Sequence, residues 1–154
     1  MRLALYQPDI PQNTGAALRL AACFNVPLDI IGPCGFPFDD KRLRRSSMDY
    51  GGACELVRHD SWNSYMALLR RETTRRLVLL STASAVTYTD FAFGPCDTLL
   101  LGRESHGVPE TVHAAADARV RIPIASNTRS LNVVVAAAVV LSEALRQQNM
   151  FDGR

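Results

Sequence analysis

Polar residues able to hold a ligand gather in three segments of the chain, at positions 7–15, 101–110 and 122–132. Amides, hydroxyls and carboxylates bind polar ligands through hydrogen bonds, and a guanidinium adds a permanent positive charge that suits phosphate. Each segment is therefore a candidate part of a ligand site. The side chains that stand out in or just after these segments are Asn13, Arg19, Glu104, Ser130 and Asn132.

The first segment leads into a predicted helix over 14–24. Asn13 or Thr14 is the natural N-cap, and Pro11 helps to end the strand before it. The core-facing stripe of this helix follows the helical repeat at Ala17, Leu20, Ala21 and Phe24.

Arg19 lies off this stripe, among the small residues Gly15, Ala16, Ala22 and Cys23. A guanidinium that rises from a face of small side chains leaves room for a large group to lie against it. An ordinary surface arginine explains the position equally well, so the residues alone leave both interpretations open.

The second segment, 101–110, runs from a predicted strand into a predicted helix. Gly102 and Gly107 permit close approach of the backbone to a ligand. The spacing is not GxGxxG and no Walker lysine follows, so a dinucleotide site and a phosphate loop are both disfavoured. Glu104 could accept a hydrogen bond from a ligand or pair with Arg103, and both possibilities stay open.

The third segment, 122–132, leads into a predicted helix whose simplest N-cap is Ser130. From 133 to 141 this helix is apolar on every side, so it must be covered all round. Its own core and a partner subunit could share that cover, or a single domain could bury the helix entirely.

The elements that position these segments alternate along the chain. Strands are predicted at 3–6, 28–31, 55–58, 77–81, 98–101 and 120–124. Helices are predicted at 14–24, 61–71, 109–115 and 131–148. This alternation is typical of an α/β fold with a mostly parallel sheet flanked by helices. Ligands bind beyond the carboxyl ends of such strands, here after Tyr6, Leu101 and Ile124.

A length of 154 residues suits one domain, spanning 1–154. The net charge is only +2, so binding of nucleic acid would depend on local patches. Two basic clusters suit a phosphate backbone: Lys41, Arg42, Arg44 and Arg45, and then Arg70, Arg71, Arg75 and Arg76.

Other features of the sequence limit the class of protein. The cysteines show no CxxC spacing, so neither a zinc site nor a disulfide framework is indicated. The longest apolar run, 133–141, is shorter than the roughly 20 residues needed to cross a bilayer. Without an export signal, the protein is expected to be cytoplasmic and to act away from membranes.

Together the three segments resemble the three motifs of the SPOUT methyltransferases, in particular their TrmH-like branch. Motif 1 is matched by IPQNTGAALRLAACF, motif 2 by LLLGRESHGVPE and motif 3 by RIPIASNTRSLNVVVAAAVVLSEALRQ, in the family's order and separation. The resemblance implies a single SPOUT domain with a C-terminal trefoil knot, acting as a homodimer. It also implies S-adenosyl-L-methionine as methyl donor, with no metal. The knot follows from the resemblance alone, because the general rule is against threaded chains.

The resemblance also implies roles for individual residues. The polar catalytic set falls on Arg19, Asn13 and Asn132. The cofactor pocket falls on Leu80, Gly102, Glu104, Ile122 and Ser130. Because a guanidinium has a pKa above about 12, we expect Arg19 to bind phosphate and stabilise a developing alkoxide rather than to act as a base. Contact with RNA is expected at Lys41, Arg42, Arg44, Arg45 and Arg129.

The short length and the stretch GFPFDDKRLRRSSMDY resemble the enzymes of this family that methylate the wobble nucleotide of tRNA. That resemblance implies transfer to the ribose 2′-hydroxyl of cytidine or a modified uridine 34, with leucine isoacceptors as the expected substrates. Two alternatives stay open, namely another tRNA or rRNA nucleotide and a non-catalytic RNA-binding protein with the same fold. A flavodoxin-like module is disfavoured, because a phosphate loop after the first strand is missing.

Overall fold

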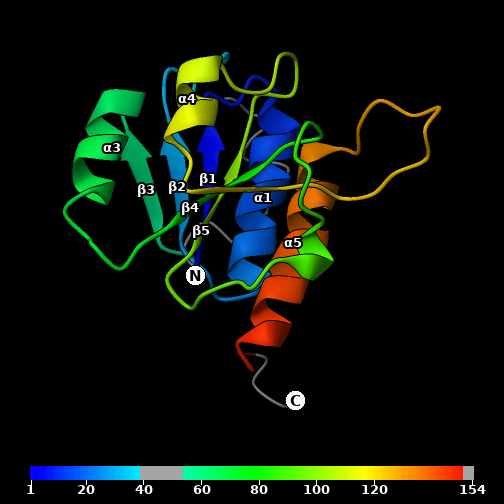
Figure 1. Ribbon diagram of the computed structural model, residues 1–154. Coiled ribbons are helices and arrows are strands. Elements are labelled where there is room, and N and C mark those ends of the chain that lie inside the picture. Colours follow the sequence, from blue (N-terminus) through cyan, green and yellow to red (C-terminus); the bar gives the residue numbers. More distant parts are fainter. Residues whose placement is uncertain (39–53, 151–154) are drawn as a thin grey trace.

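The computed structural model describes residues 1–38 and 54–150, which form one six-stranded sheet with helices packed against it (Figure 1). The strands are β1 (Arg2–Tyr6), β2 (Leu28–Ile31), β3 (Leu56–His59), β4 (Leu77–Leu80), β5 (Thr98–Leu101) and β6 (Ala118–Val120). The helices are α1 (Pro11–Cys23), α3 (Trp62–Leu69), α4 (Glu110–Ala115), α5 (Val133–Gln147) and the 3-10 helix η2 (Tyr88–Asp90). The strand order is β3-β2-β1-β5-β4-β6 and every neighbouring pair is parallel, which confirms the predicted α/β class. That one domain spans all of 1–154 stays a prediction.

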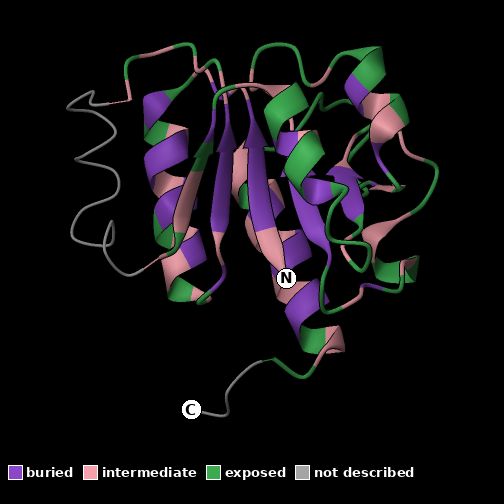
Figure 2. Cartoon of the chain, turned by 90° about the vertical axis from the view of Figure 1, so that its left-hand side faces the viewer, coloured by how far each residue is buried: buried purple, intermediate pink, exposed green. Residues whose placement is uncertain are grey.

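The core lies on both faces of this sheet. One cluster of buried side chains joins the strands to α1 and α5, and a second joins them to α3 and α4. Because successive side chains of a strand point to opposite faces, Leu5 belongs to the first cluster and Ala4 to the second. Figure 2 shows the buried strands between the two layers of helices. Cover on both faces explains why 3–6 in β1 and 99–101 in β5 are continuous apolar runs.

Helix α1 begins earlier than the sequence predicted. Its first residue is Pro11 and its N-cap is Ile10, which makes no side-chain cap, so the prediction of Asn13 or Thr14 as N-cap is wrong. Proline favours the first helical position, because its fixed φ suits a helix and it has no N–H to leave unpaired. Asn13 consequently lies within the first turn of α1, where its side chain is available for contacts outside the helix.

Helix α5 begins later than predicted. Its N-cap is Asn132, whose Oδ1 accepts hydrogen bonds from the backbone N of Val134 at 2.9 Å and of Val135 at 3.3 Å. The prediction of Ser130 as N-cap is therefore wrong. Asparagine caps as well as serine does, and Asn132 directly precedes the apolar run, so the helix begins there. Ser130 stays in the preceding loop and is exposed.

Strand β6 also differs from its predicted range. It ends at Val120 rather than at Ile124, because its partner β4 ends at Leu80, opposite Val120. Beyond this point the chain bonds to the loop after β4, where Arg121 N donates to the carbonyl of Val86 at 2.9 Å. The third strand end at the predicted ligand edge is therefore Val120.

The loop between β4 and β5 contacts the C-terminal helix as well as β6. The backbone N of Phe93 donates to Oε1 of Gln147 at 2.9 Å, and Nε2 of Gln147 donates to the carbonyl of Phe91 at 3.1 Å. A chain end threaded past this loop would make such contacts, and the trefoil knot itself stays a prediction. Within the described part of the chain, no helix is both long and apolar enough to cross a bilayer.

Candidate active site

A cavity of about 760 Å³ opens at the carboxyl ends of β4, β5 and β6. Its walls come from the loops that follow these strands, from the start of α1 and from the residues that lead into α5. Its volume falls within the range of about 300–1,000 Å³ that is common for sites binding small molecules and cofactors. The three polar segments of the sequence meet here, at the edge of the sheet where a parallel fold is expected to bind its ligand.

Most of the predicted site residues line this cavity. Asn13, Asn132 and Arg129 lie in its wall. All the residues predicted to bind the cofactor do so as well, namely Leu80, Gly102, Glu104, Ile122 and Ser130. The structure thus places them together around one space, while the roles assigned to them stay predictions.

The loop after β5 is closed tightly on itself. Arg103 and Gly107 exchange two backbone hydrogen bonds, both of 2.9 Å. A Cβ added to Gly102 would lie 2.7 Å from the carbonyl carbon of Gly107, so any side chain at Gly102 would force this loop apart. Gly107 has a φ of +65°, a left-handed conformation that glycine adopts without strain. The two glycines therefore shape the wall of the cavity by bringing two backbone segments together.

A chain of side-chain hydrogen bonds connects the three polar segments. The Nδ2 of Asn132 donates to Oδ1 of Asn13 at 3.1 Å, and the Nδ2 of Asn13 donates to Oε1 of Glu104 at 3.1 Å. Both asparagine amides are thereby oriented at the cavity wall. Asn13 from motif 1 and Asn132 from motif 3, both predicted to be catalytic, are thus linked by hydrogen bonds to Glu104 from motif 2.

The acidic groups at this edge of the sheet interact directly. Glu104 Oε2 accepts a hydrogen bond of 3.0 Å from the backbone N of Asp9. Burial and the neighbouring Asp9 carboxyl raise the pKa of Glu104. The neighbouring Glu104 carboxyl, and then the hydroxyl of Ser105, lower the pKa of Asp9 to about 2. Sequence reasoning missed Asp9, although its place just beyond the first strand, in the same segment as Asn13, was a usable signal.

Arg19 is not brought to this cavity by its own chain. It is exposed on α1 and does not occur among the described residues that line the cavity. Six residues along a helix turn through about 600°, so Arg19 and Asn13 point to different sides of α1. The predicted RNA-binding residues Lys41, Arg42, Arg44 and Arg45 lie outside the described residues.

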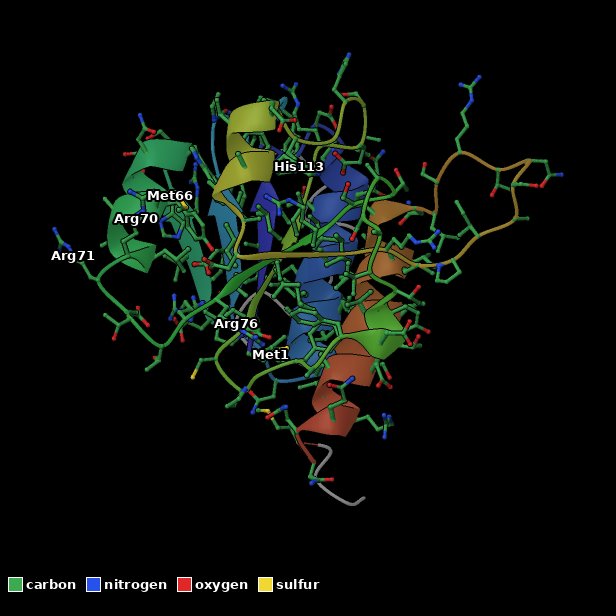
Figure 3. The ribbon with its side chains drawn as sticks, in the orientation of Figure 1. Met1, Met66, Arg70, Arg71, Arg76 and His113 are labelled. Atoms are coloured by element: carbon green, nitrogen blue, oxygen red, sulfur yellow. The ribbon has the colours of Figure 1, made fainter. Side chains whose placement is uncertain are left out.

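The second basic cluster is partly neutralised by acidic neighbours. Arg75 forms an ion pair with Glu72 at 2.8 Å, and Arg76 forms one with Asp97 at 2.8 Å. In Figure 3, Arg76 lies with Met1 at the amino ends of the strands, whereas His113 lies toward the opposite end. His113 lines the cavity and Arg76 does not belong to its wall. These arginines are therefore not part of the candidate site.

The chain resembles known proteins over almost its whole length. The model of the SpoU rRNA Methylase family matches residues 1–142. A tRNA (cytidine(34)-2'-O)-methyltransferase of Beijerinckia indica is 61% identical over 145 residues, which cover 94% of this chain and 90% of the relative. The enzyme of the same name from Escherichia coli K12 is 38% identical over 149 residues, covering 96% and 93% of the two chains.

Solved structures show the same similarity. A protein studied for the 2-OH methylation of C/U34 on tRNA has a TM-score of 0.90 and 38% identity, covering 96% of this chain and 95% of its own. The SpoU methyltransferase AviRb of Streptomyces viridochromogenes, solved with the cofactor AdoMet, has a TM-score of 0.89 and 27% identity; it covers all of this chain and 59% of its own. Since the family match takes in all three loops around the cavity, the chain belongs to the SpoU rRNA methylase family, as its resemblance to the TrmH-like methyltransferases predicted.

Proposed function

We propose that the protein transfers a methyl group from S-adenosyl-L-methionine to the ribose 2′-hydroxyl of nucleotide 34, cytidine or a modified uridine, of tRNA in the cytoplasm. The hydrogen-bonded chain from Asn132 through Asn13 to Glu104, set in the wall of a cavity of about 760 Å³, carries this proposal. Relatives named for this activity, 61% and 38% identical over more than nine-tenths of the chain, support the choice of substrate. The leucine isoacceptors are the proposed tRNAs.

The residues of the cavity fit S-adenosyl-L-methionine. Leu80 and Ile122 supply apolar surface at the strand ends, and the tight Gly102 loop presents backbone rather than side chains. Ser130 and Glu104 add polar groups to the same wall. We assign these five residues to cofactor binding. When bound, the cofactor supplies an activated methyl group on a sulfonium, and no metal is needed for its transfer.

The protein's own part in the reaction is to align and to stabilise. Transfer to oxygen is an in-line displacement, and alignment of the reacting groups can contribute about 7–11 kcal/mol in favourable cases. We assign orientation of the ribose and of Arg19 to the amides of Asn13 and Asn132. Arg19 binds the substrate phosphate and stabilises the alkoxide as the 2′-hydroxyl loses its proton. Arg129, at the rim of the cavity, contacts the RNA together with the cluster at 41–45.

We also propose that the active form is a homodimer in which Arg19 of one protomer serves the cavity of its partner. Arg19 is exposed and lies outside the cavity of its own chain. Apolar side chains stay exposed beside the starts of α1 and α5, with Ile10 at 40%, Leu131 at 41% and Val135 at 50%. A second copy that covered this surface would complete the cover that the apolar α5 requires.

The proposal is tested by incubating the purified protein with isotopically labelled S-adenosyl-L-methionine and tRNA, then mapping 2′-O-methyl nucleotides by mass spectrometry. We expect methylation at nucleotide 34, lost in Arg19→Ala and kept in Arg70→Ala, an exposed arginine at the end of α3. Arg19→Lys should also lose most activity, because lysine lacks the bidentate geometry of a guanidinium. Methylation of a different tRNA or rRNA nucleotide would overturn the substrate, and cofactor binding without any methylation would favour the non-catalytic alternative.

A further inference from the structure

The proposed mechanism leaves one acidic residue beside the cavity unused. Asp9 lies between two loops: its backbone N donates to Oε2 of Glu104 at 3.0 Å, and Gly35 packs against its other side. A Cβ added to Gly35 would lie 2.9 Å from the Cβ of Asp9, so only glycine permits this approach without a shift. Asp9 is thus confined against Glu104 by the loop that follows β2.

The two oxygens of Asp9 have different surroundings. Oδ2 accepts a hydrogen bond from the hydroxyl of Ser105 and faces Nε of Arg103 at 3.7 Å. Oδ1 is buried and, within the described part of the chain, has no hydrogen-bond partner. A buried carboxylate oxygen without a donor is unfavourable, and two ionised carboxylates side by side repel one another. One proton placed between Asp9 and Glu104 would relieve both problems.

The directions in which the two pKa values shift agree with the geometry of the pair. The neighbouring Glu104 carboxyl is the largest cause of the low pKa of Asp9, about 2. Burial is the largest cause of the raised pKa of Glu104, followed by its contact with Asp9. Two carboxyl groups whose pKa values separate in this way lose their protons in two steps, and between those steps the pair holds a single proton.

We propose that Asp9 is a positioning residue of the cavity, which holds one proton jointly with Glu104 and thereby fixes the orientation of Glu104 and Asn13. This inference rests on the proposed function for its purpose, since the cavity is taken to bind the methyl donor. While the proton is present, Glu104 can bond to Asp9 and still accept from Asn13 Nδ2. When it is lost, repulsion drives the two loops apart.

Other charged groups also face the pair. Arg103 approaches Asp9 from the loop after β5, and His106 of the same loop contacts Ser105 Oγ through Nδ1 at 2.8 Å. Helix α1 contributes Asn13 and the loop after β2 contributes Gly35, neither of which titrates. Arg103 therefore favours the ionised form of Asp9, and the shared proton lies closer to Glu104.

The sharing of a proton can be measured on the free protein by carbon-13 NMR titration of labelled glutamate carboxyl groups. We expect one signal, absent in Glu104→Gln, to titrate above the ordinary glutamate value of about 4.3 and to move down toward that value in Asp9→Asn. A Glu104 signal that titrates at the ordinary value in the wild-type protein would overturn the proposal, whether or not the variants fold.

The positioning role can be measured by calorimetric binding of S-adenosyl-L-methionine below the Glu104 midpoint. We expect Asp9→Ala to weaken binding about tenfold, as loss of one hydrogen bond to a charged group does. Asp9→Asn should restore most of this loss, because its amide can donate to Glu104 without a proton. Asp90→Ala, at an exposed aspartate of η2, is the matched control. Equal binding by Asp9→Ala and the wild type would overturn the inference. The expected pattern in a protein that methylates no tRNA would support it and refute only the proposed substrate.

Discussion

The amide of Asn132 donates a hydrogen bond of 3.1 Å to the side-chain oxygen of Asn13, although 119 positions separate the two residues. The same Asn132 side chain accepts from the backbone N of Val134 and so caps α5. One residue therefore serves both the stability of the last helix and the geometry of the cavity. Its two functions can be separated by substitution.

We expect Asn132→Ser to keep most of the stability of α5 and to lose methyl transfer. Serine caps a helix but has no amide to donate to Asn13, and a misplaced group near the reacting atoms can lower a rate roughly hundredfold. Asn132→Ala should lose the cap as well, lowering the free energy of unfolding by about 1 kcal/mol. Urea unfolding and single-turnover methylation measure the two effects.

The control for this pair is Ser61→Ala. Ser61 caps α3 by accepting from Ser64 N at 3.2 Å, away from the cavity. It should lose about 1 kcal/mol of stability with no change in methylation. If Asn132→Ser methylated at the wild-type rate, the hydrogen bond to Asn13 would have no part in catalysis.

Gly102→Ala is expected to weaken binding of the methyl donor and to destabilise the fold by about 1–3 kcal/mol, the usual effect of overpacking. The added Cβ would lie 2.7 Å from the backbone of Gly107. Gly107→Ala makes a useful comparison, because a Cβ there meets nothing within 4 Å and only the φ of +65° is unfavourable. The free energy of unfolding of Gly107→Ala should be about 1 kcal/mol lower than that of the wild type. Thermal unfolding and calorimetry distinguish the two variants, and wild-type affinity in Gly102→Ala would show that the loop adapts.

Mixing two inactive variants tests whether Arg19 acts across the proposed dimer. One variant is Arg19→Ala, and the other is Asn13→Ala. If Arg19 enters the partner's cavity, each mixed dimer has one complete site, so an equal mixture should recover about a quarter of wild-type activity. Without recovery in a mixture shown by mass to contain the mixed dimer, Arg19 would have to act within its own chain.

The burial of the Tyr65 phenol leads us to expect a loss of stability in alkaline solution. Its side chain is 2% exposed, and burial raises its pKa. The Tyr65 phenol therefore keeps its proton in the folded protein, whereas in the unfolded chain it loses this proton above about pH 10, the ordinary tyrosine pKa. The free energy of unfolding is therefore unaffected by Tyr65 below about pH 10. Above that pH it falls by about 1.4 kcal/mol per pH unit. Urea unfolding should show this slope in the wild type and a smaller one in Tyr65→Phe; equal slopes would contradict the prediction.

The strands were the most predictable elements, because burial on both faces makes most of their side chains apolar. Thr98–Leu101 and Leu28–Ile31 coincide with the predicted ranges. Helix starts were less predictable. Several residues near each start could cap, and both Ser130 and Asn132 have side chains that cap helices well.

The meeting of the three polar segments followed from the parallel sheet, since its strand ends share one edge. Other parts of the site needed the structure. Asp9 has the residue type of an ordinary turn former, and only its contact with Glu104 shows another use. The position of Arg19 outside the cavity could not be foreseen, because helical spacing shows which face a side chain takes and not what covers that face.

The distance along the chain between Asn13 and Asn132 also affects how the protein is made. Ribosomes add roughly 5–20 residues per second, so Asn13 emerges well before the residue that orients it. A nascent chain that ended before Asn132 would hold all six strands of the described sheet, but it would lack α5 and the amide that bonds to Asn13. Premature termination before Asn132 is therefore expected to yield fragments that keep the strands of the sheet and transfer no methyl group.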